Sequence, residues 1–235
     1  MASGIAAGQL FGLGLGPGDP ELVTLKALRL LRAAHVVAYP APKDGESFAR
    51  SIVAEWIAPT QREIAIGFPM RPGPPPNGIY DRAAATLAAE LDQGHDVAFL
   101  CQGDPFFYGT FAAIFTRLVP RYQVSVVPGV SSLTACAAAA ATPLVQRDDC
   151  LSVIPATLSE ADLARRLAQC DVAAIPKLGR HAGKVVRVLA ELGLLDGAIY
   201  VERASQERQR VARLADIDPA NIPYFAMALV RRNRE

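Results

Sequence analysis

The sequence predicts an α/β protein built around a mostly parallel sheet. Two observations support this prediction: short apolar segments alternate with amphipathic or Ala-rich segments, and several apolar segments end in glycine-bearing turns. Repeated alternation of strand and helix is typical of parallel strands that share one sheet with helices on its faces. The chain has 235 residues, which is enough for one large domain or two smaller ones.

The first half of the chain alternates predicted strands and helices. Residues 9–14 form an apolar run that ends in glycine, which indicates a buried strand. A helix is expected next, because leucines recur at three-residue spacing from Leu22 to Leu31 and Asp19-Pro20 supplies an N-cap and a first-turn proline. The later segments are predicted in the same way, with strands at 35–39, 62–66, 96–101 and 123–127 and helices at 46–57, 80–93, about 107–118 and after Ser131 or Ser132.

The pattern changes near residue 145, and we place a domain boundary there. Before it, five prolines and three glycines within 67–78 predict a loop. Beyond Cys150, strands are expected at 151–154, 172–175, 198–201 and 224–230 and helices at 159–168 and 180–192. We therefore predict an N-terminal α/β domain over residues 1–145 and a C-terminal α/β domain over residues 146–235.

Composition argues against several classes of function. Lys and Arg number 24 against 23 Asp and Glu, a net charge of +1, so the basic surface of a nucleic-acid binder is not expected. Four widely spaced cysteines and three histidines argue against a zinc site, and we expect buried, reduced thiols. The most apolar stretch, 133–141, is far shorter than the ~20 residues of a membrane span, and the first nine residues lack a signal-peptide pattern. We expect a cytoplasmic protein with no metal, nucleic-acid or membrane partner.

Three glycine-bearing turns follow three of the predicted strands, at 12–20, 102–105 and 128–132. Ligands of open α/β sheets bind at the carboxyl ends of strands, where glycine lets a ligand approach the backbone. Common nucleotide motifs are absent: neither Gly12 nor Gly14 begins a G-x-G-x-x-G, and no Gly-Lys precedes Ser or Thr. The Asp-Pro pairs that begin at Asp19 and Asp104 are also typical helix starts, but three such turns at one sheet edge favour a ligand site.

Together the three turns resemble the tetrapyrrole (corrin/porphyrin) methylases. Residues 12–27 (GLGLGPGDPELVTLKA) are similar to the N-terminal signature of that family, 103–110 (GDPFFYGT) to its second motif and 128–132 (PGVSS) to its third, in the same order and spacing. The resemblance extends over nearly the whole chain. It implies two α/β domains with a ligand trench between them, a homodimer, and S-adenosylmethionine (SAM) bound between the domains.

The resemblance also implies a set of SAM contacts. Backbone groups at Gly103 leave room for the amino-acid or ribose part of the cofactor, and Asp104 can accept hydrogen bonds from hydroxyl or ammonium groups. Related enzymes often carry Met where this chain has Pro176, which is a departure from the pattern. The implied contacts are Pro17, Gln102, Gly103, Asp104, Phe107, Ser131 and Ser132, with Pro176 and Ala228 from the second domain, and the product would be S-adenosylhomocysteine.

Four further segments narrow the resemblance to one group. Residues 39–43 (YPAPK), 177–180 (KLGR), 201–205 (VERAS) and 224–227 (YFAM) are similar to the precorrin-2 C(20)-methyltransferases of cobalamin biosynthesis. Pro40 stands where uroporphyrinogen methylases often have an aspartate. The implied reaction is SAM-dependent methylation of precorrin-2 at carbon 20 to give precorrin-3A. The alternatives are the same methylation of cobalt-factor II, methylation of another tetrapyrrole, and a non-catalytic SAM or tetrapyrrole carrier.

Methyl transfer from a sulfonium to an electron-rich carbon depends mainly on positioning, and a base must then remove a proton. Asp104 and Glu202 are candidate bases, beside a substrate carboxylate or water, and Tyr108 is a candidate for orienting the substrate. The implied macrocycle is a polyanion with acetate and propionate arms, and the loop 67–78 is a candidate lid or trench wall. The candidate carboxylate partners are Lys43, Arg71, Arg147, Lys177, Arg180 and Arg203.

Overall fold

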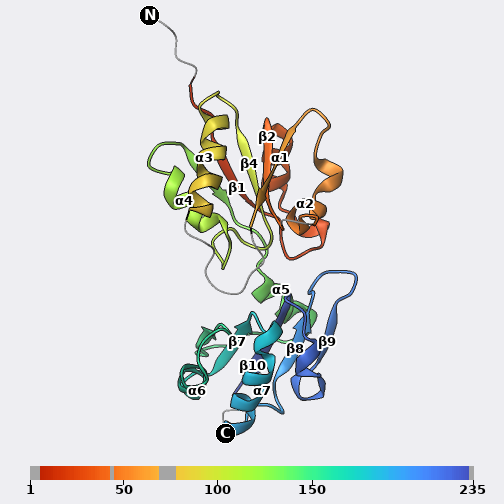
Figure 1. The fold of residues 1–235 in the computed structure, drawn as a ribbon. Coiled ribbons are helices and arrows are strands. Elements are labelled where there is room, and N and C mark those ends of the chain that lie inside the picture. Colours follow the sequence, from red (N-terminus) through yellow and green to blue (C-terminus); the bar gives the residue numbers. More distant parts are fainter. Residues whose placement is uncertain (1–5, 43–44, 69–77, 233–235) are drawn as a thin grey trace, which may run out of the picture. The chain divides into compact units, whose positions relative to one another are not determined.

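The fold consists of two compact α/β units, residues 1–131 and 132–235, each with its own sheet and core (Figure 1). The computed structural model describes residues 6–42, 45–68 and 78–232. The Pro-rich loop and its predicted lid role fall mainly on residues 69–77, outside the described residues, as do Lys43 and Arg71.

The first unit contains a fully parallel, five-stranded sheet in the order β3-β2-β4-β1-β5. Strands β1 and β4 lie side by side in its centre and are buried along their whole lengths. Every side chain of both strands is apolar or absent, which suits strands covered on both faces. The strands are β1 (Leu10–Gly14), β2 (Val36–Ala41), β3 (Arg62–Gly67), β4 (Val97–Cys101) and β5 (Val124–Val127).

Helices cover both faces of this sheet, with α1 and α2 on one side and α3 and α4 on the other (Figure 1). Alternate strand residues serve the two cores: Phe11 and Leu13 pack with α1 and α2, whereas Leu10 and Phe99 pack with α3 and α4. After β1 the chain passes to α1 on one face of the sheet, and after the adjacent β4 it passes to α4 on the other face. The topological switch point therefore lies between β1 and β4. The helices are α1 (Leu25–Ala33), α2 (Phe48–Ile52), α3 (Ile79–Leu91) and α4 (Phe111–Leu118).

The second unit is built on a mixed five-stranded sheet in the order β6-β7-β10-β8-β9. Strand β10 runs antiparallel to both of its neighbours, so β7 and β8 run in the same direction as each other. A core of aliphatic side chains joins this sheet to α6 and α7. The elements are α5 (Ser132–Ala139), β6 (Leu151–Val153), α6 (Glu160–Ala168), β7 (Val172–Pro176), α7 (Ala182–Glu191), β8 (Ile199–Glu202), β9 (Arg210–Arg213) and β10 (Ala226–Arg231).

The α/β class predicted from the sequence is confirmed, while several details differ. The first helix begins at Leu25, because the Thr24 hydroxyl caps it through Ala27 N–H at 3.2 Å, and Asp19 instead caps a separate 3-10 turn, Pro20–Leu22. The predicted helix over 46–57 is α2 followed by a 3-10 turn, and α4 starts only at Phe111. Strand β9 was not predicted, since its exposed side chains leave no apolar face to recognise.

The division between the units also differs from the predicted boundary after residue 145. Helix α5 packs against β8 and β10 and so belongs to the second unit. Its Ala-rich sequence carries no apolar stripe that would indicate which sheet it joins. Among the described residues, the structure has no helix that is both long and apolar enough to cross a bilayer.

The thiols provide a test of this packing. Cys101, Cys136 and Cys170 are buried, burial raises the pKa of each, that of Cys136 to about 12, and Cys150 is exposed. Since the thiolate is the reactive form, we expect Ellman's reagent to modify one thiol per native chain at pH 8 and all four after unfolding. A Cys150→Ser variant should lose the fast reaction, and two or more fast thiols in the native protein would contradict the packing.

Candidate functional site

The first candidate site is the carboxyl edge of the first sheet. Strands β4, β1 and β5 are adjacent and parallel, so the segments that follow them, 102–108, 15–20 and 128–131, emerge at the same edge. These segments overlap the three glycine-bearing turns predicted from the sequence at 102–105, 12–20 and 128–132. The switch point between β1 and β4 lies at their centre, which is where open α/β sheets bind ligands.

The three turns contact one another through their backbones. Gly103 N–H donates to Gly16 O at 2.7 Å, and Gly16 N–H donates back to Gly103 O at 3.3 Å. A Cβ added to Gly14 would lie 2.4 Å from Gly129 N, and one added to Gly129 would lie 2.3 Å from Gly103 O. No side chain fits at Gly14 or Gly129, so glycine at these positions permits the three strand ends to touch.

The glycines serve different purposes. A Cβ on Gly12 would lie 2.4 Å from the Phe111 ring, so Gly12 makes room for α4 and not for a ligand. Gly103 has a φ of 68°, which favours glycine, and nothing lies within 4 Å of the position of an added Cβ. Gly103 is therefore the glycine whose open side suits a bound molecule.

Asp104 connects two of the turns. Its Oδ1 accepts from Phe106 N–H at 2.9 Å, and its Oδ2 accepts from Gly129 N–H at 3.1 Å. The first bond closes a local turn and the second ties the β4 turn to the β5 turn. Each carboxylate oxygen keeps a further lone pair for a ligand, but the geometry makes Asp104 first of all a link between the turns.

Aromatic side chains follow Asp104 on the same turn. Tyr108 is 49% exposed and has a φ of 56°, an uncommon backbone conformation for a residue other than glycine. The Phe107 and Tyr108 rings meet edge to face with centroids 5.0 Å apart, while Phe106 packs against Phe115 at 5.1 Å. Phe107 and Tyr108 thus follow Gly103 and Asp104 within the same segment after β4.

The predicted SAM contacts divide between the two units. Pro17, Gln102 and Ser131 lie in the turns of the first unit, whereas Ser132 begins α5 and belongs to the second. Pro176 ends β7, and Ala228 is fully buried in β10, opposite Ile175 and Tyr200.

The second candidate site is one edge of the second sheet. Because β7 and β8 flank β10 and both run opposite to it, their carboxyl ends and the start of β10 meet there. Lys177 and Arg203 follow these strand ends directly, with φ values of 62° and 48°. Arg180 lies nearby in the 3-10 turn Gly179–His181, where burial and the charges of Lys184 and Arg180 lower the pKa of His181.

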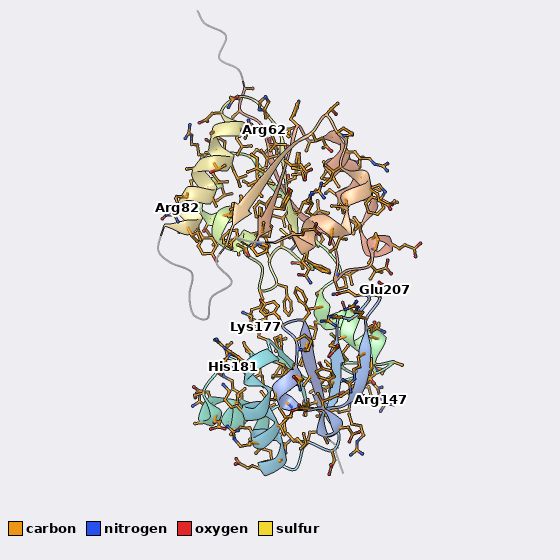
Figure 2. All side chains as sticks on the ribbon, turned by 45° about the vertical axis from the view of Figure 1, so that its right-hand side comes forward. Arg62, Arg82, Arg147, Lys177, His181 and Glu207 are labelled. Carbon is orange, nitrogen blue, oxygen red and sulfur yellow. The ribbon has the colours of Figure 1, made fainter. Side chains whose placement is uncertain are left out.

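Arg147 does not lie at this edge. Its loop is tied by Asp149 to Arg231, at the far end of β10, through a 2.7 Å ion pair. Figure 2 shows Lys177 and His181 close together and Arg147 well away from both. Lys177, Arg180 and Arg203 therefore all follow strand ends at one edge of the second sheet, and Arg147 does not lie at that edge.

A buried tyrosine lies behind Arg203. Tyr200 and Glu202 are two residues apart on β8, so their side chains share one face, and the Tyr200 hydroxyl donates to Glu202 Oε2. Glu202 Oε1 lies 3.6 Å from Arg203 Nη1. Burial and Glu202 raise the pKa of Tyr200. Sequence reasoning missed Tyr200, although the Tyr-x-Glu spacing at the end of a predicted strand was a usable signal.

Comparison with known protein sequences identifies close relatives. Residues 9–218 match the family model of the Tetrapyrrole (Corrin/Porphyrin) Methylases. The chain is 39% identical over 237 residues to a precorrin-2 C(20)-methyltransferase of Sinorhizobium sp, covering 97% of both chains. It is 44% identical to the cobalamin biosynthesis protein CobIJ of Mycobacterium tuberculosis, and its match spans 47% of the length of that relative.

Solved structures share the fold. A cobalt precorrin-4 methyltransferase superposes with a TM-score of 0.73 at 25% identity, covering 95% of this chain and 94% of the other. A uroporphyrin-III C-methyltransferase from Thermus thermophilus, complexed with S-adenosylhomocysteine, gives a TM-score of 0.70 at 25% identity and covers 95% and 97%.

The glycine contacts lead to a stability prediction. In Gly129→Ala the new methyl group would meet Gly103 O, a backbone atom, so we expect the free energy of unfolding to fall by about 1–3 kcal/mol. Gly67→Ala, where nothing lies within 4 Å of the added Cβ, is the matched control and should unfold like the wild type. Urea denaturation measures both, and equal stability of the two variants would contradict the close approach.

Proposed function

Because the chain belongs to the tetrapyrrole (corrin/porphyrin) methylases, we propose that it transfers a methyl group from SAM to carbon 20 of precorrin-2 in cobalamin biosynthesis. The observation that carries this proposal is the match to a precorrin-2 C(20)-methyltransferase, 39% identical over 97% of both chains. A fold shared with a methyltransferase that binds S-adenosylhomocysteine supports SAM as the methyl donor. Because the match spans 47% of the mycobacterial relative, the proposal concerns the activity of this chain and not that of a protein as long as the relative.

The residues of the glycine turns fit a SAM site. The open side of Gly103 leaves room for a molecule against the backbone, and the proposed contacts Pro17, Gln102, Asp104, Phe107 and Ser131 lie on the three turns that meet at this edge. Ser132, Pro176 and Ala228 belong to the second unit and enter the proposal only because the family resemblance implies them as SAM contacts. When bound, SAM supplies a methyl group on a positively charged sulfur, which is already activated for transfer.

The main work of the protein in this reaction is to hold the reactants in position. Well-oriented reactants gain about 7–11 kcal/mol over free ones, and the rigid contact of three strand ends provides such a platform. We assign Tyr108, which is exposed beside Gly103 in the same turn, to orienting the macrocycle. Lys177, Arg180 and Arg203 are the proposed partners of its carboxylate arms, a function that suits guanidinium and ammonium groups.

The two carboxylates considered as bases are better suited to other roles. Both oxygens of Asp104 accept bonds from backbone N–H groups, and both oxygens of Glu202 face donors, Tyr200 and Arg203. A carboxylate whose two oxygens already face hydrogen-bond donors is poorly placed to accept a proton from the substrate. We therefore propose that a substrate carboxylate or water removes the proton from the methylated carbon.

A second candidate substrate is the cobalt complex. The chain is 32% identical to a cobalt-precorrin-2 C(20)-methyltransferase of Salmonella typhimurium over 97% of its length, so both substrates have relatives in support. The sequence identity is higher to the relative named for precorrin-2, so we favour metal-free precorrin-2 as the substrate. A cytoplasmic homodimer completes the proposal, and light scattering after gel filtration tests the dimer.

Anaerobic turnover assays distinguish these possibilities. The purified chain is incubated with SAM and, in parallel, precorrin-2, its cobalt complex and uroporphyrinogen III. We expect a product one methyl group heavier, labelled at carbon 20, from metal-free precorrin-2. Methylation of the cobalt complex alone would favour the second candidate, and binding of SAM without turnover of any macrocycle would identify a carrier.

The link made by Asp104 gives a binding prediction. Asp104→Ala removes the tie between the β4 and β5 turns, so we expect S-adenosylhomocysteine to bind about tenfold more weakly in calorimetry. Asp96→Ala is the control, because Asp96 also accepts a backbone N–H, that of Gln9 at 2.8 Å, but at the opposite edge of the same sheet. Equal affinities of both variants and the wild type would refute the role of Asp104.

A further inference from the structure

The contacts around Arg203 point to a role for two residues behind it. Arg203 sits immediately after β8 with its backbone in the left-handed region, φ 48°, a conformation that costs a residue other than glycine on the order of 1 kcal/mol. Its N–H donates to Phe225 O at 2.9 Å, which ties this backbone to the residue that precedes β10. The main chain thus fixes where the Arg203 side chain begins.

Two residues of β8, Tyr200 and Glu202, form a relay behind the Arg203 side chain, in which Tyr200 contacts Glu202 and Glu202 faces Arg203. Tyr200 is fully buried in the core, and its hydroxyl donates to Glu202 Oε2. The Glu202 side chain is 13% exposed, and its other oxygen lies 3.6 Å from Arg203 Nη1. The Tyr200 hydroxyl bonds one oxygen of the carboxylate, and the other oxygen faces one nitrogen of the guanidinium.

This arrangement contributes little as a stabilising ion pair. The 3.6 Å separation is longer than a hydrogen bond, and the Arg203 side chain is 36% exposed, where such pairs contribute about 0–1 kcal/mol. A guanidinium has five N–H donors on three nitrogens, and Glu202 faces one nitrogen. The geometry restrains Arg203 in direction while leaving a planar donor group for an incoming carboxylate.

The surroundings suit an anion. Lys177 follows β7, which runs parallel to β8 on the other side of β10, and Arg180 lies three residues beyond Lys177, so cationic residues follow two strand ends at this edge. A carboxylate at Arg203 would lie at the sheet edge that also carries Lys177 and Arg180, and one oxygen of Glu202 is already occupied by the Tyr200 hydroxyl. Because guanidinium and carboxylate pair in a planar, two-point manner, orientation of Arg203 matters for affinity.

We propose that Tyr200 and Glu202 are positioning residues that orient Arg203 toward a carboxylate arm of the tetrapyrrole substrate. This inference rests on the proposed function for the identity of the substrate. Arg203 touches the substrate, while Tyr200 and Glu202 act through it. The relay thereby contributes to selection of a macrocycle with a carboxylate at that position.

The test compares Tyr200→Phe with a matched control. Tyr122→Phe removes a hydroxyl from a similar trio in the first unit, where Tyr122 donates to Asp92 at 2.8 Å and Arg121 pairs with the same carboxylate at 2.8 Å. We expect Tyr200→Phe to raise the KM for precorrin-2 about three- to tenfold, with kcat and the affinity for S-adenosylhomocysteine nearly unchanged. Tyr122→Phe should leave all three values at the wild-type level.

A double-mutant cycle shows whether Tyr200 acts through Arg203. Arg203→Ala should raise the KM at least as much as Tyr200→Phe, and adding Tyr200→Phe to it should change nothing further. Arg203→Lys should not restore the wild-type KM, since an ammonium lacks the planar pair of donors. Additive effects of the two substitutions, or a wild-type KM in Tyr200→Phe, would overturn the proposal.

Equilibrium binding separates this proposal from the proposed function. Fluorescence titration with uroporphyrin III, a carboxylated macrocycle, needs no turnover. We expect the wild type and Tyr122→Phe to bind it most tightly, and Tyr200→Phe and Arg203→Ala to bind it more weakly, in the order of their KM values. If the wild type methylates nothing but this order holds, the proposed function fails and the relay stands. If the wild type is active and Tyr200→Phe binds the macrocycle like the wild type, the relay fails alone.

Discussion

The close approach of three glycines at the carboxyl edge of the first sheet is the constraint on which the rest of the candidate site depends. Gly14, Gly103 and Gly129 bring the ends of β1, β4 and β5 into backbone contact, and no side chain fits at Gly14 or Gly129. Asp104 strengthens this contact, and the aromatic residues that follow it are placed as a consequence. Local rigidity of this kind suits a reaction in which the protein mainly positions its reactants.

Much of the first unit could be predicted from sequence, because buried parallel strands and glycine turns leave strong local signals. The central strands are uninterrupted apolar runs, and the order of the three turns was sufficient to indicate the family. The purpose of each glycine was not predictable: Gly12 serves the packing of Phe111, a residue almost a hundred positions away. Long-range packing of that sort has no local signature in the sequence.

The second unit was predicted less completely for related physical reasons. Strand β9 is an edge strand with exposed side chains, so only its antiparallel pairing with β8 identifies it. Helix α5 is Ala-rich on all sides, and its place with β8 and β10 comes from tertiary packing. The candidate cations were chosen by residue type, and topology then separated Arg147 from Lys177, Arg180 and Arg203. The net charge of +1 thus says nothing of where the cations lie, and three of the candidates follow strand ends at one edge of the second sheet.

The central claim is that the methyl donor lies against the open side of Gly103 at the carboxyl edge of β1, β4 and β5. The most direct measurement is a crystal structure of the chain with S-adenosylhomocysteine. The account predicts the ligand in contact with the Gly103 backbone, with the bond from Gly129 N–H to Asp104 retained. A ligand bound at the opposite edge of the sheet, near His35 and Asp96, or one that separates the three turns, would contradict it.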